Sequence, residues 1–133
     1  MILGLDHIGV VVKDLKKAIL LEHLNLTVGE REEIGHLKVA VAFFQVNGNR
    51  IELISPLTEH HELTQYMKER GEGLHHIAFK VRDMNESVEN LERLGIRIAQ
   101  GRRRGKGHGG KEIAFLNEED TCGILIELCQ EKR

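Results

Sequence analysis

Apolar and polar positions follow the same pattern in two halves of the chain. The matching pairs, in chain order, are GLDHIGVVVKDL and GLHHIAFKVRDM, VAFFQ and IAFLN, and RIELIS and LIELCQ. The offset between partners grows from 69 to 72 to 75 residues, while the order of the stretches is kept. With only two copies, this pattern indicates duplication of one module, with loops of different length, and not a repeat array.

Each copy predicts the same series of secondary-structure elements. A β-rich run comes first, at Leu5 to Val12 and again at His75 to Val81. An aspartate then precedes a helical stretch, Asp14 in the first copy and Asp83 in the second, where its side chain can accept hydrogen bonds from free N–H groups. Three further strands follow, separated by short polar turns. Each module is therefore predicted to be βαβββ.

The two modules are expected to form one domain. We place module one at about residues 1–57, an amphipathic linking helix at about 58–72, and module two at about 73–133. The predicted fold is α+β, with the modules related by pseudo-twofold symmetry and forming a curved eight-stranded mixed sheet with helices outside it.

Composition narrows the range of functions. Apolar residues make up 41% and charged residues 30% of 133 residues, which is typical of a globular protein. A net charge of −2 and the absence of Trp argue against a nucleic-acid partner, and no apolar run reaches the ~20 residues that span a bilayer. Cys122 and Cys129 lack CxxC spacing and are expected to be reduced thiols in a cytoplasmic protein.

Two residue types recur at matching places in both modules. These are two histidines in the first strands and two glutamates in the last strands: His7, His76, Glu52 and Glu127. Each glutamate stands between apolar neighbours in the sequence IEL, where an ionised carboxylate needs a positive partner. Two imidazoles and two carboxylates make a mixed nitrogen and oxygen site for a divalent cation, with positions left open for substrate. The sheet is therefore predicted to surround a metal site.

A glycine-rich basic stretch, GRRRGKGHGGK, spans residues 101–111. One interpretation is a solvated surface loop. The other is an anion-binding loop, in which backbone N–H groups and cations receive a charged substrate. The cations concerned are Arg102, Arg103, Arg104 and Lys106.

Taken together, these motifs resemble the vicinal oxygen chelate (glyoxalase/bleomycin resistance/dioxygenase) superfamily. The resemblance covers almost the whole chain and is carried by DHIGVVVKDL, NRIELISPL, GEGLHHIAFKV, GHGGKEIAFL and GILIEL, in that order. GEGLHHIAF, ELISPL and the GHGGK loop are similar to the methylmalonyl-CoA epimerase branch in particular.

The resemblance implies a homodimer that holds one divalent ion (Co, Zn, Ni or Mn) on His7, Glu52, His76 and Glu127. It also implies epimerisation at C2 of methylmalonyl-CoA through a metal-stabilised enolate. Glu127 maps onto the ligand that also acts as a base. The second base maps onto Lys38, with Glu33 and Gln45 as alternatives. For an acyl-CoA thioester, the basic stretch would meet the phosphates.

Two other functions stay open at this point. The same His/Glu/His/Glu set is the pattern of lactoylglutathione lyase (glyoxalase I), which works on a different substrate with the same fold and metal. A metal-free small-molecule binding module is the third alternative. Such relatives bind their ligands in an aromatic-lined groove. Aromatic residues make up only 4% of this chain, which argues against a groove of that kind.

Overall fold

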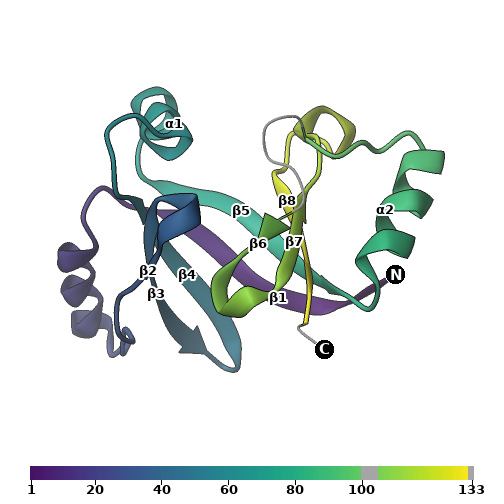
Figure 1. The fold of residues 1–133 in the computed structure, drawn as a ribbon. Helices are drawn as coiled ribbons and strands as arrows, with labels where there is room; N and C mark the ends of the chain where they lie inside the picture. The colour runs from purple at the N-terminus through teal and green to yellow at the C-terminus, as the bar shows by residue number, and fades with distance from the viewer. Residues whose placement is uncertain (100–104, 132–133) are drawn as a thin grey trace. The chain divides into compact units, whose positions relative to one another are not determined.

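The computed structural model describes residues 1–99 and 105–131, and these divide into two units. The N-terminal unit is His7–His75. The C-terminal unit is His76–Arg133 together with Met1–Asp6, so the first six residues belong with the second half of the chain. Eight strands lie within the described residues, in parallel and antiparallel pairs (Figure 1). The predicted α+β class with eight strands in a mixed sheet is confirmed, whereas the twofold relation between modules stays a prediction.

The strands that lie wholly or partly in the N-terminal unit are ordered β2-β3-β4-β1, and β1 belongs to this unit from His7 onward. Their bounds are Ile2–Val11 for β1, Glu32–Ile34 for β2, Val39–Val46 for β3 and Asn49–Pro56 for β4. β1 runs parallel to β4, and the other two pairs are antiparallel. The β3–β4 hairpin turns at Asn47 and Gly48, with φ of 51° and 80°. Positive φ at both central residues suits the twist of a two-residue hairpin, which explains an Asn-Gly pair there.

Two longer helices belong to the N-terminal unit. Leu15–Leu24 forms a 3-10 helix (η1), and Asp14 caps it by accepting a hydrogen bond from the Lys16 amide at 2.9 Å, as the sequence predicted. Glu62–Arg70 forms α1, which buries Leu63 and Met67 in the same apolar cluster as Val11 and residues of β3. A short 3-10 turn, η2, spans Gly35–Leu37.

The next four strands are ordered β5-β8-β7-β6, and β5 belongs to the C-terminal unit from His76 onward. Their bounds are Gly73–Val81 for β5, Gly105–Lys106 for β6, Glu112–Phe115 for β7 and Ile126–Gln130 for β8. β5 runs parallel to β8, and β7 is antiparallel to β8 and to β6. Two short 3-10 turns complete the unit, η3 at His108–Gly110 and η4 at Glu118–Asp120.

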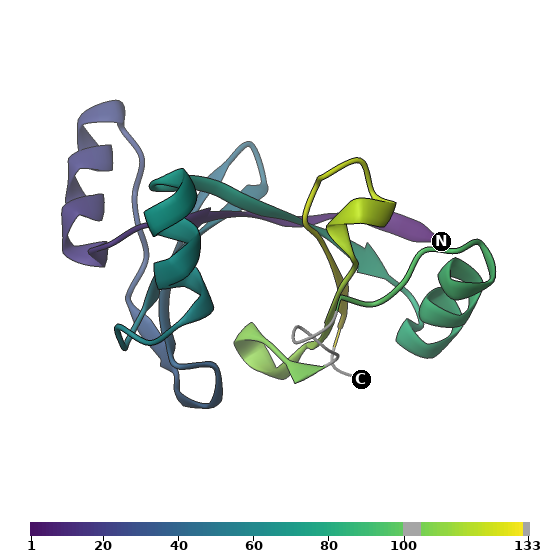
Figure 2. The same ribbon diagram turned by 90° about the horizontal axis from the view of Figure 1, so that it is seen from above.

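Helix α2 (Met84–Arg93) packs on β7 and β8, and its position beside them can be followed in Figures 1 and 2. Met84 is fully buried and lies in one cluster with Val88 and Leu128. The helix ends before Gly95, whose φ of 87° is the left-handed conformation expected of a C-terminal glycine. None of the helices in the described ranges is long and apolar enough to cross a membrane.

Asp83 begins α2, since its Oδ1 accepts a hydrogen bond from the Glu86 amide at 3.0 Å. Asp83→Ala leaves that amide without its cap and should lower the free energy of unfolding by about 1 kcal/mol. Asp83→Asn keeps an oxygen acceptor and serves as the control. Urea denaturation followed by circular dichroism measures both variants. Equal stability of the alanine variant and the wild type would show that the cap contributes nothing.

Candidate active site

His7 and Glu52 face each other within the N-terminal unit. His7 lies on β1 and Glu52 on β4, and the parallel register sets Gly9, two residues beyond His7, opposite Glu52. The His7 Nε2 atom is 3.8 Å from the Glu52 Oε1 atom. Their exposed fractions are only 7% and 6%. A carboxylate this well removed from water requires positive charge nearby, so the pair indicates a functional site more than a solvated strand face.

Phe43 lies beside both residues of the His7–Glu52 pair. It lies directly opposite Glu52 in the antiparallel register of β3 and β4. Its ring meets the His7 ring edge-on, with centroids 6.3 Å apart and an interplanar angle of 87°. The aromatic neighbour limits the orientations open to the imidazole and keeps water from one side of it.

The C-terminal unit contains a matching pair, His76 and Glu127. The parallel register of β5 and β8 sets Ala78, two residues beyond His76, opposite Glu127. Phe115 of β7 lies opposite Glu127 and meets the His76 ring edge-on, with centroids 5.6 Å apart at 83°. Both polar residues are buried.

The duplicated sequence therefore produces duplicated local geometry. In each unit a buried glutamate has two neighbours directly opposite it in the sheet. On the parallel strand the residue opposite it lies two positions after the histidine, and on the antiparallel strand the residue opposite it is a phenylalanine. This repetition of register, burial and ring contact arises because both copies keep the same order of strand motifs, from DHI or HHI to IEL, although the loops between them differ in length. An imidazole nitrogen and a carboxylate oxygen are thus available in each unit as donors for a metal ion.

Cys129 supports the glutamate of β8. Its Sγ donates a hydrogen bond to the Glu127 Oε1 atom at 3.2 Å, and the thiol is buried. Burial raises the pKa of the Cys129 thiol far above its ordinary value, and the negative charges of Glu127 and Asp6 raise it further. The sulfur therefore stays protonated and acts as a donor.

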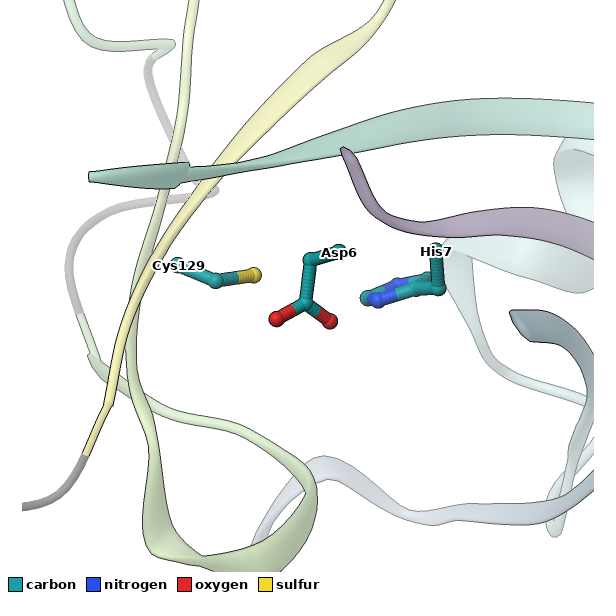
Figure 3. A group of neighbouring side chains, drawn as sticks. All are labelled: Asp6, His7 and Cys129. Carbon is teal, nitrogen blue, oxygen red and sulfur yellow. The ribbon is translucent and has the colours of Figure 1, made fainter. Parts of the chain in front are cut away.

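Asp6, which is buried, and Lys111, which is partly exposed, form an ion pair in the same unit. The Lys111 Nζ atom lies 3.0 Å from the Asp6 Oδ2 atom and 3.4 Å from Glu131. Burial by itself lowers the pKa of Lys111, but the hydrogen bond and charge of Asp6 outweigh it and raise the pKa above its usual value. Figure 3 shows the Cys129 sulfur facing the Asp6 carboxylate, together with His7, the residue that follows Asp6 in β1.

Two of the three candidates for a second base, Lys38 and Glu33, lie apart from the His7–Glu52 pair. Lys38 is exposed at a left-handed position (φ 55°) before β3, five residues from Phe43, or roughly 17 Å along a strand. Glu33 is exposed and forms an ion pair with Arg31. Gln45 shares the sheet face of Phe43 but is exposed at the end of the hairpin.

The basic stretch is described only in part. Arg102, Arg103 and Arg104 lie outside the described residues. Lys106 is exposed on β6, the two-residue strand that follows them. Lys111 belongs to the same stretch, but its ammonium group is paired with the Asp6 carboxylate. Its charge is therefore not offered to an anionic ligand.

The residues beside the proposed ligands could not be predicted from the sequence. Asp6 and Lys111 are 105 positions apart, and no local pattern connects them. Cys129 is recognisable only once β8 is known, because it lies two residues beyond Glu127 on the same strand face.

Comparison with known proteins is consistent with this arrangement. Residues 6–115 match the Glyoxalase/Bleomycin resistance protein/Dioxygenase superfamily model. The uncharacterised protein YqjC of Bacillus subtilis is 37% identical over 130 residues, covering 96% of this chain and 92% of the relative. The mitochondrial methylmalonyl-CoA epimerase of Bos taurus is 32% identical over 129 residues, covering 95% of this chain and 73% of the relative.

Two solved structures show the same fold. Methylmalonyl-CoA epimerase from Mycobacterium tuberculosis has a TM-score of 0.88 at 28% identity, covering 99% of this chain and 90% of that one. A methylmalonyl-CoA epimerase in complex with methylmalonyl-CoA and NH4+ has a TM-score of 0.87 at 25% identity, covering 98% and 96%. The chain belongs to the Glyoxalase/Bleomycin resistance protein/Dioxygenase superfamily. Within it, the chain is an epimerase-like enzyme, as the sequence predicted.

Proposed function

We propose that the protein epimerises methylmalonyl-CoA at C2 by removing and returning a proton. The observation that carries this proposal is the buried His–Glu pair found with the same register in both units. The substrate follows from the relatives, which are named methylmalonyl-CoA epimerases, one of them bound to methylmalonyl-CoA. A C2 proton between a thioester carbonyl and a carboxylate is acidic enough for a carboxylate base, provided that the developing oxyanion is stabilised.

We further propose that His7, Glu52, His76 and Glu127 hold one divalent ion. The donor set suits such an ion, because imidazole nitrogen and carboxylate oxygen bind it at about 2.0–2.2 Å. Two donors at that distance from one ion lie at most about 4.4 Å apart, and His7 Nε2 and Glu52 Oε1 are 3.8 Å apart. When bound, the ion supplies Lewis-acid stabilisation of negative charge on the substrate oxygens. Co, Zn, Ni and Mn all suit this set.

Glu127 is the proposed base on one face of the substrate. Its carboxylate takes the proton from C2, and the electron pair of the broken C–H bond delocalises into the thioester carbonyl. The Cys129 thiol donates to Oε1, which fixes one oxygen and orients the group. Phe115 lies opposite Glu127 and limits water at this position.

The proton returns from a second base on the opposite face. Lys38 remains the candidate proposed from the sequence, and Glu33 is the alternative; Gln45, the third position considered there, carries an amide that cannot act as a base. To identify the second base, deuterium incorporation from D2O is measured for Lys38→Met and Glu33→Gln, starting from each epimer separately. The variant that lacks the second base should lose exchange from one epimer while keeping it from the other.

Conversion of a single epimer of methylmalonyl-CoA to an equal mixture tests the proposed function. Prolonged chelation should abolish turnover, and adding back one divalent ion should restore it, with elemental analysis giving the metal content at each step. The hemithioacetal of glutathione and methylglyoxal is the comparison substrate. Turnover of that substrate alone would replace the proposal with lactoylglutathione lyase, and ligand binding without metal or turnover would replace it with a binding module.

For the basic stretch we propose contact with the CoA phosphates. Neutralising Arg102, Arg103 and Arg104 together should raise KM for the CoA thioester about tenfold or more while kcat changes little. Phosphates lie far from the reacting carbon, so their contacts are equally strong in the ground and transition states. Steady-state kinetics checks this, with the phosphate-free methylmalonyl-pantetheine as control. An unchanged KM for the CoA ester would assign the stretch to the solvated surface.

A homodimer in the cytoplasm is likewise a proposal, based on the family resemblance. Sedimentation equilibrium gives the mass in solution and so tests whether the protein is a homodimer.

A further inference from the structure

Arg50 shares a strand and a sheet face with Glu52. In the antiparallel register of β3 and β4, Gln45 lies opposite Arg50 and Phe43 lies opposite Glu52. Residues directly opposite each other point to the same face, and so do residues two apart on one strand. The Arg50 side chain therefore starts roughly 7 Å from that of Glu52, on the face that carries the His7–Glu52 pair.

The guanidinium of Arg50 is held in place by Phe43. Its Cζ atom is 4.1 Å from the centre of the Phe43 ring, the same ring that meets His7 edge-on. Stacking uses the flat face of a guanidinium and leaves its N–H edge free to donate. The half-buried side chain is thus ordered beside the site, with several donors still available.

Arg50 makes no ion pair or hydrogen bond within residues 1–99 and 105–131. Other arginines on the surface do find carboxylates: Arg31 pairs with Glu33 at 2.9 Å and Arg97 with Asp120 at 3.0 Å. A stacked, half-buried cation without an anionic partner, two residues from a buried glutamate, is suited to receive an anion from outside the chain.

We infer that Arg50 binds the free carboxylate of the acyl group and so selects malonyl-type thioesters over simple acyl thioesters. This inference rests on the proposed function, whose substrate carries a carboxylate one bond from the reacting carbon. The phosphates of CoA are the other oxyanions that a guanidinium fork would accept. They are separated from C2 by the length of the pantetheine arm, whereas Arg50 starts only two residues from Glu52.

Arg50→Met removes the charge and the donors but retains much of the side-chain volume. It should raise KM for methylmalonyl-CoA about 10- to 100-fold, the range expected from loss of a charge-assisted hydrogen bond. Arg50→Lys keeps the charge without the planar fork and should recover part of the loss. Arg93→Met, an exposed arginine on α2, is the matched control and should keep wild-type KM. Thermal melts of all three variants separate a binding effect from loss of the fold.

Methylmalonyl-pantetheine distinguishes the two sources of oxyanion. If Arg50 contacts the carboxylate, Arg50→Met raises KM for the CoA and pantetheine esters alike. A rise confined to the CoA ester would assign Arg50 to the phosphates and overturn the inference, as would an unchanged KM for both esters.

Binding by calorimetry tests the same contact without turnover. Wild-type protein should prefer malonyl-CoA to acetyl-CoA, and Arg50→Met should reduce that preference about tenfold or more. An unchanged preference in Arg50→Met overturns the inference, even if wild-type protein turns over methylmalonyl-CoA. A preference that depends on Arg50 in a protein without epimerase activity would refute the proposed function while retaining the Arg50 contact.

Discussion

Glu127→Gln should retain bound metal and lose most of the epimerase activity. Glutamine still offers an oxygen to a cation, and its amide can still meet the Cys129 thiol, but it cannot take a proton as a carboxylate does. The expected loss in kcat is about 10²- to 10⁴-fold, or about 3–5 kcal/mol of barrier. Glu52→Gln is the matched control, because Glu52 has the same burial and the same register in the other unit.

We expect Glu52→Gln to keep its metal and most of its activity, since its proposed role is ligation alone. His7→Ala and His76→Ala should lose metal and activity together. Metal content and turnover, measured on all four variants, separate ligation from proton transfer. Near wild-type turnover in Glu127→Gln would reduce Glu127 to a ligand and place proton transfer on another group.

Lys111→Met should destabilise the fold by about 3 kcal/mol, because it leaves the Asp6 carboxylate buried without its cation. Only 3% of the Asp6 side chain is exposed, and Lys111 is 3.0 Å away. Because the pKa of Lys111 is raised in the folded state, the stability that the ion pair contributes depends on pH. The stabilisation is present below the unfolded-state pKa of about 10.4 and is lost as the pH rises through the folded-state value.

The double variant Asp6→Asn/Lys111→Met removes both charges and should be less destabilised than Lys111→Met alone. Lys80→Met, an exposed lysine on β5 of the same unit, should change stability by no more than about 0.5 kcal/mol. Denaturant unfolding of these variants, together with the single variant Asp6→Asn, completes the double-mutant cycle. If Lys111→Met is as stable as Lys80→Met, the ion pair makes no net contribution to folding.

The parts of the fold that the sequence predicted depend on local pattern. Asp14 and Asp83 precede helices because a side-chain oxygen close in sequence satisfies the first free amides. The doubled IEL predicted two buried glutamates because an acidic residue between apolar neighbours repeats at matching places. Strand alternation then fixes which side of the sheet each glutamate faces.

What the sequence did not predict depends on contacts between distant segments. Lys111 stands in a glycine-rich basic stretch that suggests anion binding, and only the fold brings it to Asp6. Arg50 follows the turn between β3 and β4, and its stacking on Phe43 requires the register of these two strands. Neither periodicity nor composition carries that information.

Exchange of the C2 proton in D2O tests the central claim most directly. Wild-type protein with its metal is incubated with one epimer of methylmalonyl-CoA, and NMR follows both the C2 proton and the epimer ratio. The proposed mechanism predicts that the product epimer carries deuterium at C2 and that Glu127→Gln slows its formation by two orders of magnitude or more. A metal-loaded wild-type protein that leaves the C2 proton in place, while it converts the glutathione hemithioacetal, would contradict the claim.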